Sequence, residues 1–277
     1  MEARKTEMDA ALFPDKIKAY VLGAETMDFS RSPRAKTYFI DRDEGYFLKI
    51  APRDALAHEA AMMTYFFNKN MTARVCDYIS DGDTDYLVME RVKGHNCLWE
   101  EYVNAPEKLS VVLGESVRRL HDLDHDDCPK KGINSFIVPL AHKKYQSNDI
   151  DVWLLEYSDY KTPEDAYRFL CEHEQGLVED VCLHGDPSLP NILLENFKLS
   201  GFIDFDGGGI GDRHFDLLWV VWSLSFTLKT NGFKDRFLDA YGRDKFDVNR
   251  YNLCIALRAF TFTESRRLRG KLYESSI

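Results

Sequence analysis

Two stretches decide the fold of this chain: Leu183-His184-Gly185-Asp186-Pro187-Ser188-Leu189-Pro190-Asn191 and, further on, Phe202-Ile203-Asp204-Phe205-Asp206. Asp186 is followed five residues later by Asn191, and Asn191 is followed thirteen residues later by Asp204. This spacing is typical of phosphoryl transfer, which needs in-line positioning, a cation on the phosphates and an acceptor for the hydroxyl proton. Asp186, on a loop before a strand, suits the proton acceptor. Asn191 and Asp204 offer the hard oxygen ligands that Mg²⁺ takes.

A lysine and a glutamate in the N-terminal third complete this pattern. Lys49 ends a predicted strand, and Glu59 lies ten residues further on, inside a predicted helix. In a kinase-like small lobe, a strand lysine holds the α- and β-phosphates and a helix glutamate orients that lysine. An isolated strand lysine is usually a solvated edge residue, but the flanking Leu48 and Ile50 favour the functional interpretation.

The same strand, together with the chain after the next hairpin, offers a place for an adenine ring. Phe47 precedes Lys49 by two residues and therefore shares its face of the strand, where its ring could stack on a base. Backbone groups of Met89, Glu90 and Val92 are expected to hydrogen-bond the edge of the base. The expected cofactors are ATP, with GTP as an open alternative, and Mg²⁺.

The periodicity of apolar residues divides the chain near residue 92. For the first part the pattern predicts a small, mostly antiparallel sheet with one inserted helix. The elements expected there are a leading helix within 1–22 that is broken or begins near Pro14, a hairpin of 38–40 and 46–50, a helix over 54–69, and strands 75–79 and 85–89. From Gly94 on, helical spacing dominates: a buried face over 109–121, a capped start at Thr162, short apolar strands at 192–194 and 201–203, and helices near 213–227, 234–241 and 247–268. We therefore expect an α+β, bilobal protein-kinase-like fold, with a nucleotide-binding lobe over 1–92 and a catalytic and substrate-binding lobe over 93–277.

With these residues in place, the chain resembles the aminoglycoside phosphotransferases. The resemblance is carried by His184-Gly185-Asp186…Asn191, by Ile203-Asp204, and by Gly209-Ile210-Gly211-Asp212-Arg213-His214-Phe215-Asp216-Leu217. It runs from about Ser32 to Phe260 and is nearest to the 3′-phosphotransferase branch that modifies kanamycin and neomycin. It implies an ATP- and Mg²⁺-dependent enzyme that phosphorylates a hydroxyl group of an aminoglycoside, with a nucleotide loop that begins at Ser32. The motifs are much less specific for the acceptor, because choline, homoserine and methylthioribose kinases share them.

The chain departs from that branch at two places. Asp206 and the next residue stand where those enzymes commonly carry a Gly-Arg pair. Leu257-Arg258-Ala259-Phe260 stands where they end in an acidic–aromatic tail that helps to bind the antibiotic, and Arg258 argues against the standard substrate pose. Glu264 or Glu274, in the seventeen residues that follow, could take over that role.

The charge of the chain points to a cationic acceptor. Thirty-six Lys and Arg against forty-six Asp and Glu give a net charge of −10, which disfavours wrapping of duplex DNA, so no nucleic-acid partner is expected. Ten of the acids and only two bases lie between residues 145 and 180. Carboxylates are natural ligands of a polycation, although a solvated helix and loop would have the same composition. The acceptor contacts expected are Asp151, Glu156, Asp159, Asp206 and Glu264.

No segment predicts a disulfide framework, a signal peptide or a membrane span. The six cysteines include no CxxC pair and are expected to be reduced, mostly buried thiols. The longest apolar stretch, 217–228, is well short of the ~20 residues that a membrane helix needs. We expect a cytoplasmic protein, a monomer or weak dimer, with no membrane partner.

Two alternatives to an aminoglycoside kinase stay open. One is a kinase of a small hydroxyl metabolite, such as an amino-alcohol or a sugar, which Arg258 favours over the aminoglycoside. The other is a non-catalytic, nucleotide-binding pseudokinase. The intact set of predicted functional residues argues against it: Lys49, Glu59, Asp186, Asn191 and Asp204.

Overall fold

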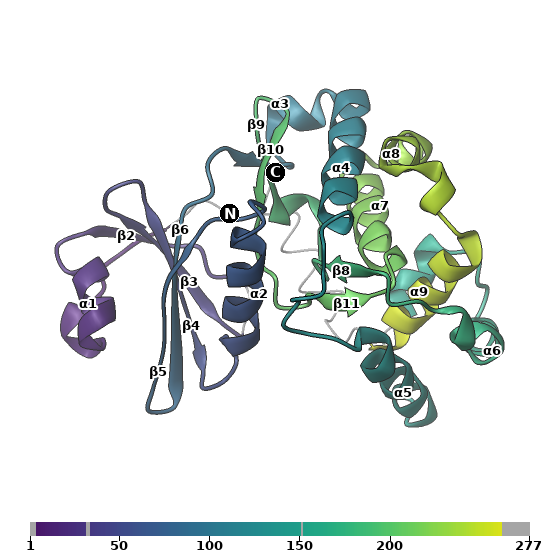
Figure 1. Ribbon diagram of the computed structural model, residues 1–277, viewed down its shortest axis with the longest axis horizontal. Coiled ribbons are helices and arrows are strands. Elements are labelled where there is room, and N and C mark those ends of the chain that lie inside the picture. The colour runs from purple at the N-terminus through teal and green to yellow at the C-terminus, as the bar shows by residue number, and fades with distance from the viewer. Residues whose placement is uncertain (1–3, 32–33, 151, 262–277) are drawn as a thin grey trace.

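The computed structural model describes residues 4–31, 34–150 and 152–261. A β-rich N-terminal part packs beside a larger, mainly helical C-terminal part (Figure 1). This arrangement confirms the predicted α+β, bilobal kinase-like fold. Three predicted site residues, Ser32, Asp151 and Glu264, lie outside the described residues, as does the end of the helix expected to reach residue 268.

The N-terminal part is built on one six-stranded sheet with the strand order β1-β2-β3-β4-β6-β5. All neighbouring strands in it are antiparallel. The predicted hairpin is formed by β3 and β4, and the next two predicted strands are β5 and β6. The bounds are β1 (Arg4–Thr6), β2 (Glu25–Asp28), β3 (Lys36–Asp41), β4 (Tyr46–Pro52), β5 (Val75–Asp81) and β6 (Thr84–Glu90).

The leading helix is shorter than the sequence predicts. Helix α1 (Asp15–Val21) begins directly after Pro14, as expected. Residues Arg4–Thr6, however, form β1, which pairs with β2. The Thr26 hydroxyl also donates a hydrogen bond to the Thr6 carbonyl oxygen (2.6 Å). These partners come from a distant segment, so local residue preference does not reveal the strand.

Two separate apolar cores lie on the two faces of the sheet. Helix α1 covers one face, where Ile17 and Val21 pack with Ile40, Leu48 and Val88. Helix α2 (Ala57–Phe67) lies between the other face and the helical part (Figure 1). Its apolar residues belong to the same core as the C-terminal helices. The α2 face of the sheet is therefore the one that meets the C-terminal part.

Seven helices of the C-terminal part are described: α3 (Glu100–Val103), α4 (Pro106–His121), α5 (Ile133–Gln146), α6 (Pro163–His173), α7 (His214–Leu228), α8 (Lys234–Tyr241) and α9 (Val248–Thr261). Helix α4 buries the predicted face, and the Thr162 hydroxyl caps α6 by accepting the Asp165 N–H (3.1 Å). The sequence pattern does not predict α5, which contains Pro139, a residue that usually disrupts a helix interior. Short 3₁₀ turns span Ala10–Leu12, Val152–Tyr157, Glu174–Gly176, Leu189–Asn191 and Arg243–Lys245.

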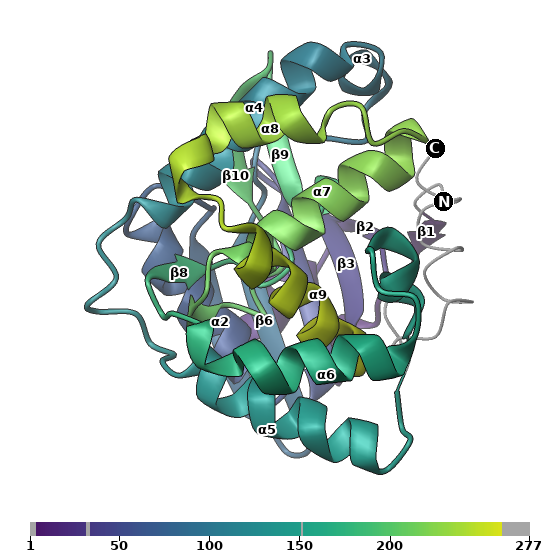
Figure 2. The ribbon, with the colours of Figure 1, turned by 90° about the vertical axis from the view of Figure 1, so that its right-hand side faces the viewer.

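Two small antiparallel sheets interrupt these helices and carry the decisive stretches. One has the order β10-β9-β7, and in the other β11 pairs with β8. Residues 184–191 connect β8 to β9, and residues 203–208 connect β10 to β11, so both stretches lie between the same two sheets. Seen from the side of the helical part, α5, α6 and α9 lie in front of the N-terminal sheet (Figure 2). The bounds are β7 (His95–Asn96), β8 (Val181–Leu183), β9 (Ile192–Glu195), β10 (Lys198–Phe202) and β11 (Gly209–Gly211).

None of the helices in the part of the chain that the structure describes combines the length and apolarity needed to cross a membrane.

Candidate active site

The two parts of the molecule meet at Lys49 of β4. Its ammonium nitrogen Nζ lies 2.5 Å from Glu59 Oε1 of α2 and 3.1 Å from Asp204 Oδ1, which follows β10. The Glu59 side chain is buried, whereas the Asp204 carboxylate is half exposed. The lysine and glutamate that the sequence pairs are therefore in contact, and the second aspartate of the motif joins them.

Burial and mutual charge set the ionisation of these three groups. Burial alone would lower the pKa of Lys49, but Asp204 and Glu59 raise it above its ordinary value. Burial raises the pKa of Glu59 to about 7, against the opposing effect of Lys49. The charge of Lys49 lowers the pKa of Asp204. At neutral pH the site thus holds a charged lysine, which can bind phosphates, and an anionic aspartate, which can bind a metal ion.

Helix α2 is tied to the loop after the second site aspartate. His58 Nε2 lies 3.0 Å from the Gly208 carbonyl oxygen, and because a carbonyl only accepts, His58 carries a proton on Nε2. The Phe66 ring stacks on Phe205 with 4.6 Å between ring centroids. Phe205 in turn packs against the His184 ring at 4.5 Å. The helix that positions Glu59 and the catalytic loop therefore belong to one packed unit.

The loop that carries Asp186 is held by a buried aspartate, Asp216 of α7. Its two carboxylate oxygens accept the backbone N–H groups of His184 (2.7 Å) and Gly185 (2.9 Å). Burial alone would raise the pKa of Asp216, but His121 and the Gly185 N–H hold it below its ordinary value. The sequence pattern assigns Asp216 no role of its own; only its place in the family motif points to it.

Gly185 turns the chain immediately before Asp186. Its φ is +94°, and a β-carbon there would lie 2.1 Å from the Gly207 carbonyl group, so no larger residue is tolerated. His184 holds the other side of the turn: its Nε2 donates to the Ile203 carbonyl oxygen (3.0 Å) and its Nδ1 accepts the Asp186 N–H (3.2 Å). This is a neutral tautomer, and burial lowers the pKa of His184 accordingly.

The backbone brings Asn191 and Asp204 together. The Ile203 N–H donates to the Asn191 carbonyl oxygen (3.0 Å), so the two predicted metal ligands lie on neighbouring segments. The Asn191 side-chain nitrogen donates to the Asp186 carbonyl oxygen (3.0 Å), which leaves the amide oxygen as the ligand atom. An amide oxygen beside an exposed carboxylate is the hard donor set that Mg²⁺ prefers. The residues present therefore fit a magnesium ion.

The predicted nucleotide residues lie along β4 and β6. Phe47 and Met89 face each other across this strand pair. The Glu90 N–H donates to the Arg74 carbonyl oxygen (2.9 Å), and the Glu90 carboxylate accepts from the Arg74 guanidinium (2.6 Å). The Glu90 N–H is thus already used within the protein. Val92, two residues after Glu90, is buried.

The predicted acceptor residues come from separate segments. Asp206 is exposed on the loop after Asp204, and its charge acts on Glu59. Glu156 and Asp159 are exposed between α5 and α6. Their segment packs onto the C-terminal core through aromatic rings: the ring centroids of Trp153 and of Trp222 in α7 are 5.2 Å apart.

Arg258 of α9 is also close to the catalytic loop. Its guanidinium carbon lies 5.1 Å from the centroid of the Phe215 ring. Burial lowers the pKa of Arg258, although Cys254, Asp216 and Asp186 act in the opposite direction. A positive charge thus stands where the resemblance implies carboxylates.

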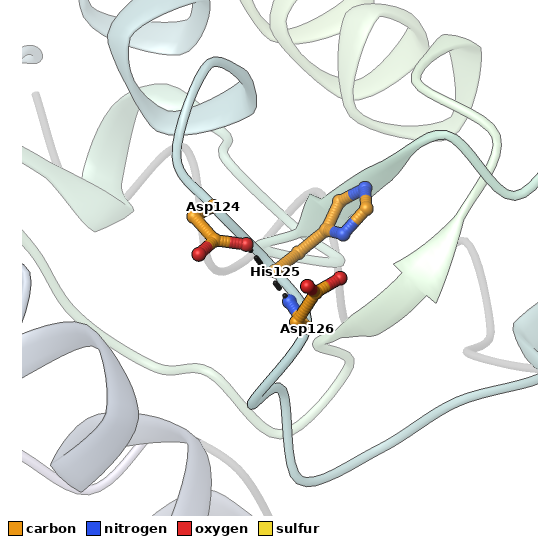
Figure 3. Close-up of side chains that lie close together, drawn as sticks. All are labelled: Asp124, His125 and Asp126. Atoms are coloured by element: carbon orange, nitrogen blue, oxygen red, sulfur yellow. Dashed lines mark hydrogen bonds between the residues drawn. The ribbon is translucent and has the colours of Figure 1, made fainter.

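A second group of residues with metal-binding side chains lies in the loop after α4 (Figure 3). Ligand atoms of Asp124, His125 and Asp126 are within 4.8 Å of one another. The Asp126 N–H donates to Asp124 Oδ1 (3.1 Å), and His125 Nε2 donates to the Asp180 carbonyl oxygen (3.1 Å). These bonds describe a hydrogen-bonded turn, and we assign no metal ion to it.

Fold and site together define a kinase-like phosphotransferase, an enzyme that moves a phosphoryl group from a nucleotide to a hydroxyl group. Comparison with known proteins specifies the family. Residues 31–253 match the phosphotransferase enzyme family. The chain is 39% identical over 241 residues to a probable aminoglycoside 3′-phosphotransferase of Lactococcus lactis, covering 87% of this chain and 92% of the relative. It is 32% identical to an aminoglycoside 3′-phosphotransferase of Niallia circulans, covering 77% and 83%. The chain therefore belongs to the phosphotransferase enzyme family that includes the aminoglycoside phosphotransferases.

Solved structures confirm the fold. An aminoglycoside-3′-phosphotransferase of type VIII superposes with a TM-score of 0.69 at 23% identity, covering 88% of this chain and 96% of that one. An aminoglycoside phosphotransferase of Streptomyces rimosus, solved with ADP and streptomycin, superposes with a TM-score of 0.63 at 20% identity, covering 82% and 90%. At these identities the likeness shows the fold alone.

Proposed function

We propose that this chain transfers the γ-phosphoryl group of ATP to a hydroxyl group of an aminoglycoside and thereby inactivates the antibiotic. The observation that carries this proposal is the contact of Lys49 with both Glu59 and Asp204. It joins the residue that binds phosphates to the residue that binds the metal ion, across the two parts of the molecule. The relatives named aminoglycoside 3′-phosphotransferases support the same class of acceptor.

Each group in the site has a defined task. Lys49 binds the α- and β-phosphates, and Glu59 orients its ammonium group. Asn191 and Asp204 would hold Mg²⁺, which when bound neutralises charge on the β- and γ-phosphates. Asp186 accepts the proton of the attacking hydroxyl group, so that its oxygen can bond to the γ-phosphorus. Hydrogen bonds to the Asp186 backbone N–H and carbonyl hold in place the loop 184–191, which we take as the catalytic loop.

The base of the nucleotide is proposed to lie between the sheet and the linker that follows β6. Phe47 supports one face of the ring, with Met89 behind it. The Glu90 carbonyl and the Val92 N–H bond its edge, and Ser32 is proposed to contact the phosphates. A carbonyl acceptor followed by an N–H donor matches the edge of adenine, so ATP is favoured over GTP.

Two observations bear on the acceptor. Glu156 and Asp159 expose carboxylates on one segment and Asp206 exposes another, which suits a polycation; Asp151 and Glu264 are proposed as further contacts. Arg258, by contrast, carries a positive charge close to Asp186. That charge favours a second candidate function, phosphorylation of a small hydroxyl metabolite.

A panel assay separates these functions. ADP release is measured with kanamycin, neomycin, choline, homoserine and methylthioribose, and the phosphorylated product is identified by mass spectrometry. We expect the highest kcat/KM with an aminoglycoside. Release only with a metabolite would replace the first proposal by the second. Nucleotide binding without release on any acceptor would identify a pseudokinase.

We further propose that residues 1–92 act as the nucleotide-binding lobe and 93–277 as the catalytic and substrate-binding lobe. All the groups assigned above come from one chain, so we propose that the monomer is active, with at most weak dimerisation. Size-exclusion chromatography at assay concentration tests this. We place the reaction in the cytoplasm, where ATP is available.

A further inference from the structure

Two buried cysteines lie in contact behind the catalytic loop. Cys128 Sγ and Cys182 Sγ are 3.1 Å apart, and their residues are 5% and 1% exposed. The S–S bond of a disulfide is ~2.05 Å long, so about one ångström separates these thiols from a covalent link. Sequence spacing gave no indication of this pair.

The backbone around both sulfurs is already held in place. Cys182 is the central residue of β8 and lies opposite Ile210 of β11. Cys128 lies between α4 and α5, in a segment that is also bonded to β11: the Ile210 N–H donates to the Lys130 carbonyl oxygen (2.8 Å). Because β11 pairs with the strand of Cys182 and bonds Lys130, two residues from Cys128, we expect the sulfurs to approach by rotation of side chains, without a large movement of the backbone.

The hydrogen bonds give the two sulfurs different roles. The Cys128 S–H group donates to the Lys130 carbonyl oxygen (3.3 Å), so the proton between the sulfurs belongs to Cys182. The hydrogen bond from Cys182 lowers the pKa of Cys128. Cys128 is also the more exposed of the two. The hydrogen bond from Cys182 favours the thiolate of Cys128, which makes Cys128 the attacking sulfur in the step below.

We propose that Cys128 and Cys182 form an oxidisable dithiol, which a hydroperoxide converts to a disulfide in the folded enzyme. Cys128 gives up its thiol proton and its sulfur attacks a peroxide oxygen; an S–O bond forms, the O–O bond breaks, and the leaving oxygen takes up that proton, which yields a sulfenic acid and water or an alcohol. The Cys182 sulfur then attacks the Cys128 sulfur; the S–S bond forms, the S–O bond breaks, and water leaves with the Cys182 proton. The sulfurs lose two electrons, and the hydroperoxide gains them.

The link would join the strand that leads into the catalytic loop to the segment that follows α4. The two cysteines are 54 residues apart in the chain, and a cross-link over such a distance stabilises a protein mainly by restricting its unfolded state. The catalytic loop itself keeps its bonds to Asp216 and Ile203. We therefore expect oxidation to raise heat resistance and to leave turnover unchanged. This inference does not depend on the identity of the acceptor.

The test uses the reduced, full-length enzyme. It is treated with hydrogen peroxide, unfolded, alkylated and mapped by peptide mass spectrometry. We expect alkylation of four of the six cysteines and a peptide pair that joins Cys128 to Cys182. The melting temperature should rise by roughly 5 °C or more and return with dithiothreitol.

Matched variants make the result specific. Cys128→Ser and Cys182→Ser should each abolish the link. Cys97→Ser, which changes another buried thiol, and Cys171→Ser, which removes an exposed one, should retain it. Alkylation of all six wild-type cysteines after oxidation, or a link that forms only in urea or between other cysteines, would overturn the proposal. A loss of turnover that the reductant restores would overturn the stabilising role.

Discussion

Removal of the Asp216 carboxylate should destabilise the protein strongly. In Asp216→Ala the backbone N–H groups of His184 and Gly185, bonded at 2.7 and 2.9 Å, lose their acceptor inside the core. Each buried donor left unsatisfied costs about 1–3 kcal/mol, so the two together predict a loss of about 2–6 kcal/mol in the free energy of unfolding. His121, whose Nε2 lies 3.1 Å from Asp216 Oδ2, loses a partner as well, which favours the upper half of that range.

The same substitution should also lower turnover. The freed N–H groups belong to the turn that sets the position of Asp186. A displacement of 1 Å at a catalytic group can cost about 10²-fold in rate, so we expect kcat to fall by roughly one to two orders of magnitude. The KM for ATP should change little, because the bonds of Asp216 run to the acceptor side of the site and not to Lys49.

Urea unfolding followed by tryptophan fluorescence measures the first effect, and the coupled ADP assay measures the second. Asp122→Ala is the matched control, because Asp122 is 55% exposed and pairs with Arg118 at the surface, where ion pairs contribute about 0–1 kcal/mol. A loss below about 1 kcal/mol in Asp216→Ala, or a wild-type kcat, would refute the supporting role.

The pH dependence of stability gives an independent check. The pKa of Asp216 in the folded protein lies below its ordinary value of 3.8. Its contribution is therefore complete above that value and is lost as the pH falls through the lower pKa of the folded state. The stability difference between wild type and Asp216→Ala should be constant above about pH 5 and shrink below about pH 4. A difference that grows on acidification would contradict the sign of the shift.

Four further variants probe the rest of the site. Asp186→Ala should lower kcat by ~10²–10⁴-fold while calorimetry with an ATP analogue shows unchanged affinity, because the base acts on the acceptor; more than a tenth of wild-type kcat would exclude that role. Glu59→Gln should raise the KM for ATP and lower kcat, because Lys49 loses one of the two carboxyl groups that hold its ammonium group; unchanged ATP kinetics would rule out an orienting role. Asp204→Ala should abolish the gain in ATP-analogue affinity that Mg²⁺ produces, and a calorimetric Mg²⁺ titration like that of wild type would place the metal elsewhere. Neutralising Glu156 and Asp159 together, to Gln and Asn, should raise the acceptor KM and weaken its dependence on KCl, since the Debye length falls from ~10 Å at 0.1 M to ~3 Å at 1 M; a KM that does not vary with salt in wild type would argue for a small, weakly charged acceptor.

The local sequence pattern was sufficient to predict most of the fold and the kinds of functional side chain in the site. Strand alternation located the four strands from Lys36 to Glu90, and helical spacing located α4, because each depends on residues close in the chain. The pairing of Lys49 with Glu59 was predictable for the same reason: a strand and the helix that follows it leave few ways to place a lysine and a glutamate ten residues apart. Local pattern failed for Arg4–Thr6, whose partner strand is remote, and for α5, where Pro139 opposes the helix that tertiary packing stabilises.

By itself, then, the sequence determined which residues can bind phosphate, metal and proton, and in which kinds of element they lie. The tertiary structure alone decided which of the residues that are remote in the chain meet. Asp204 reaches Lys49 across 155 positions of the chain, Asp216 supports His184 across 32, and Cys128 touches Cys182 across 54. Residue type and periodicity specify local conformation and the face that is buried. The distance between remote side chains depends on how buried faces pack against one another, which is a property of the whole core.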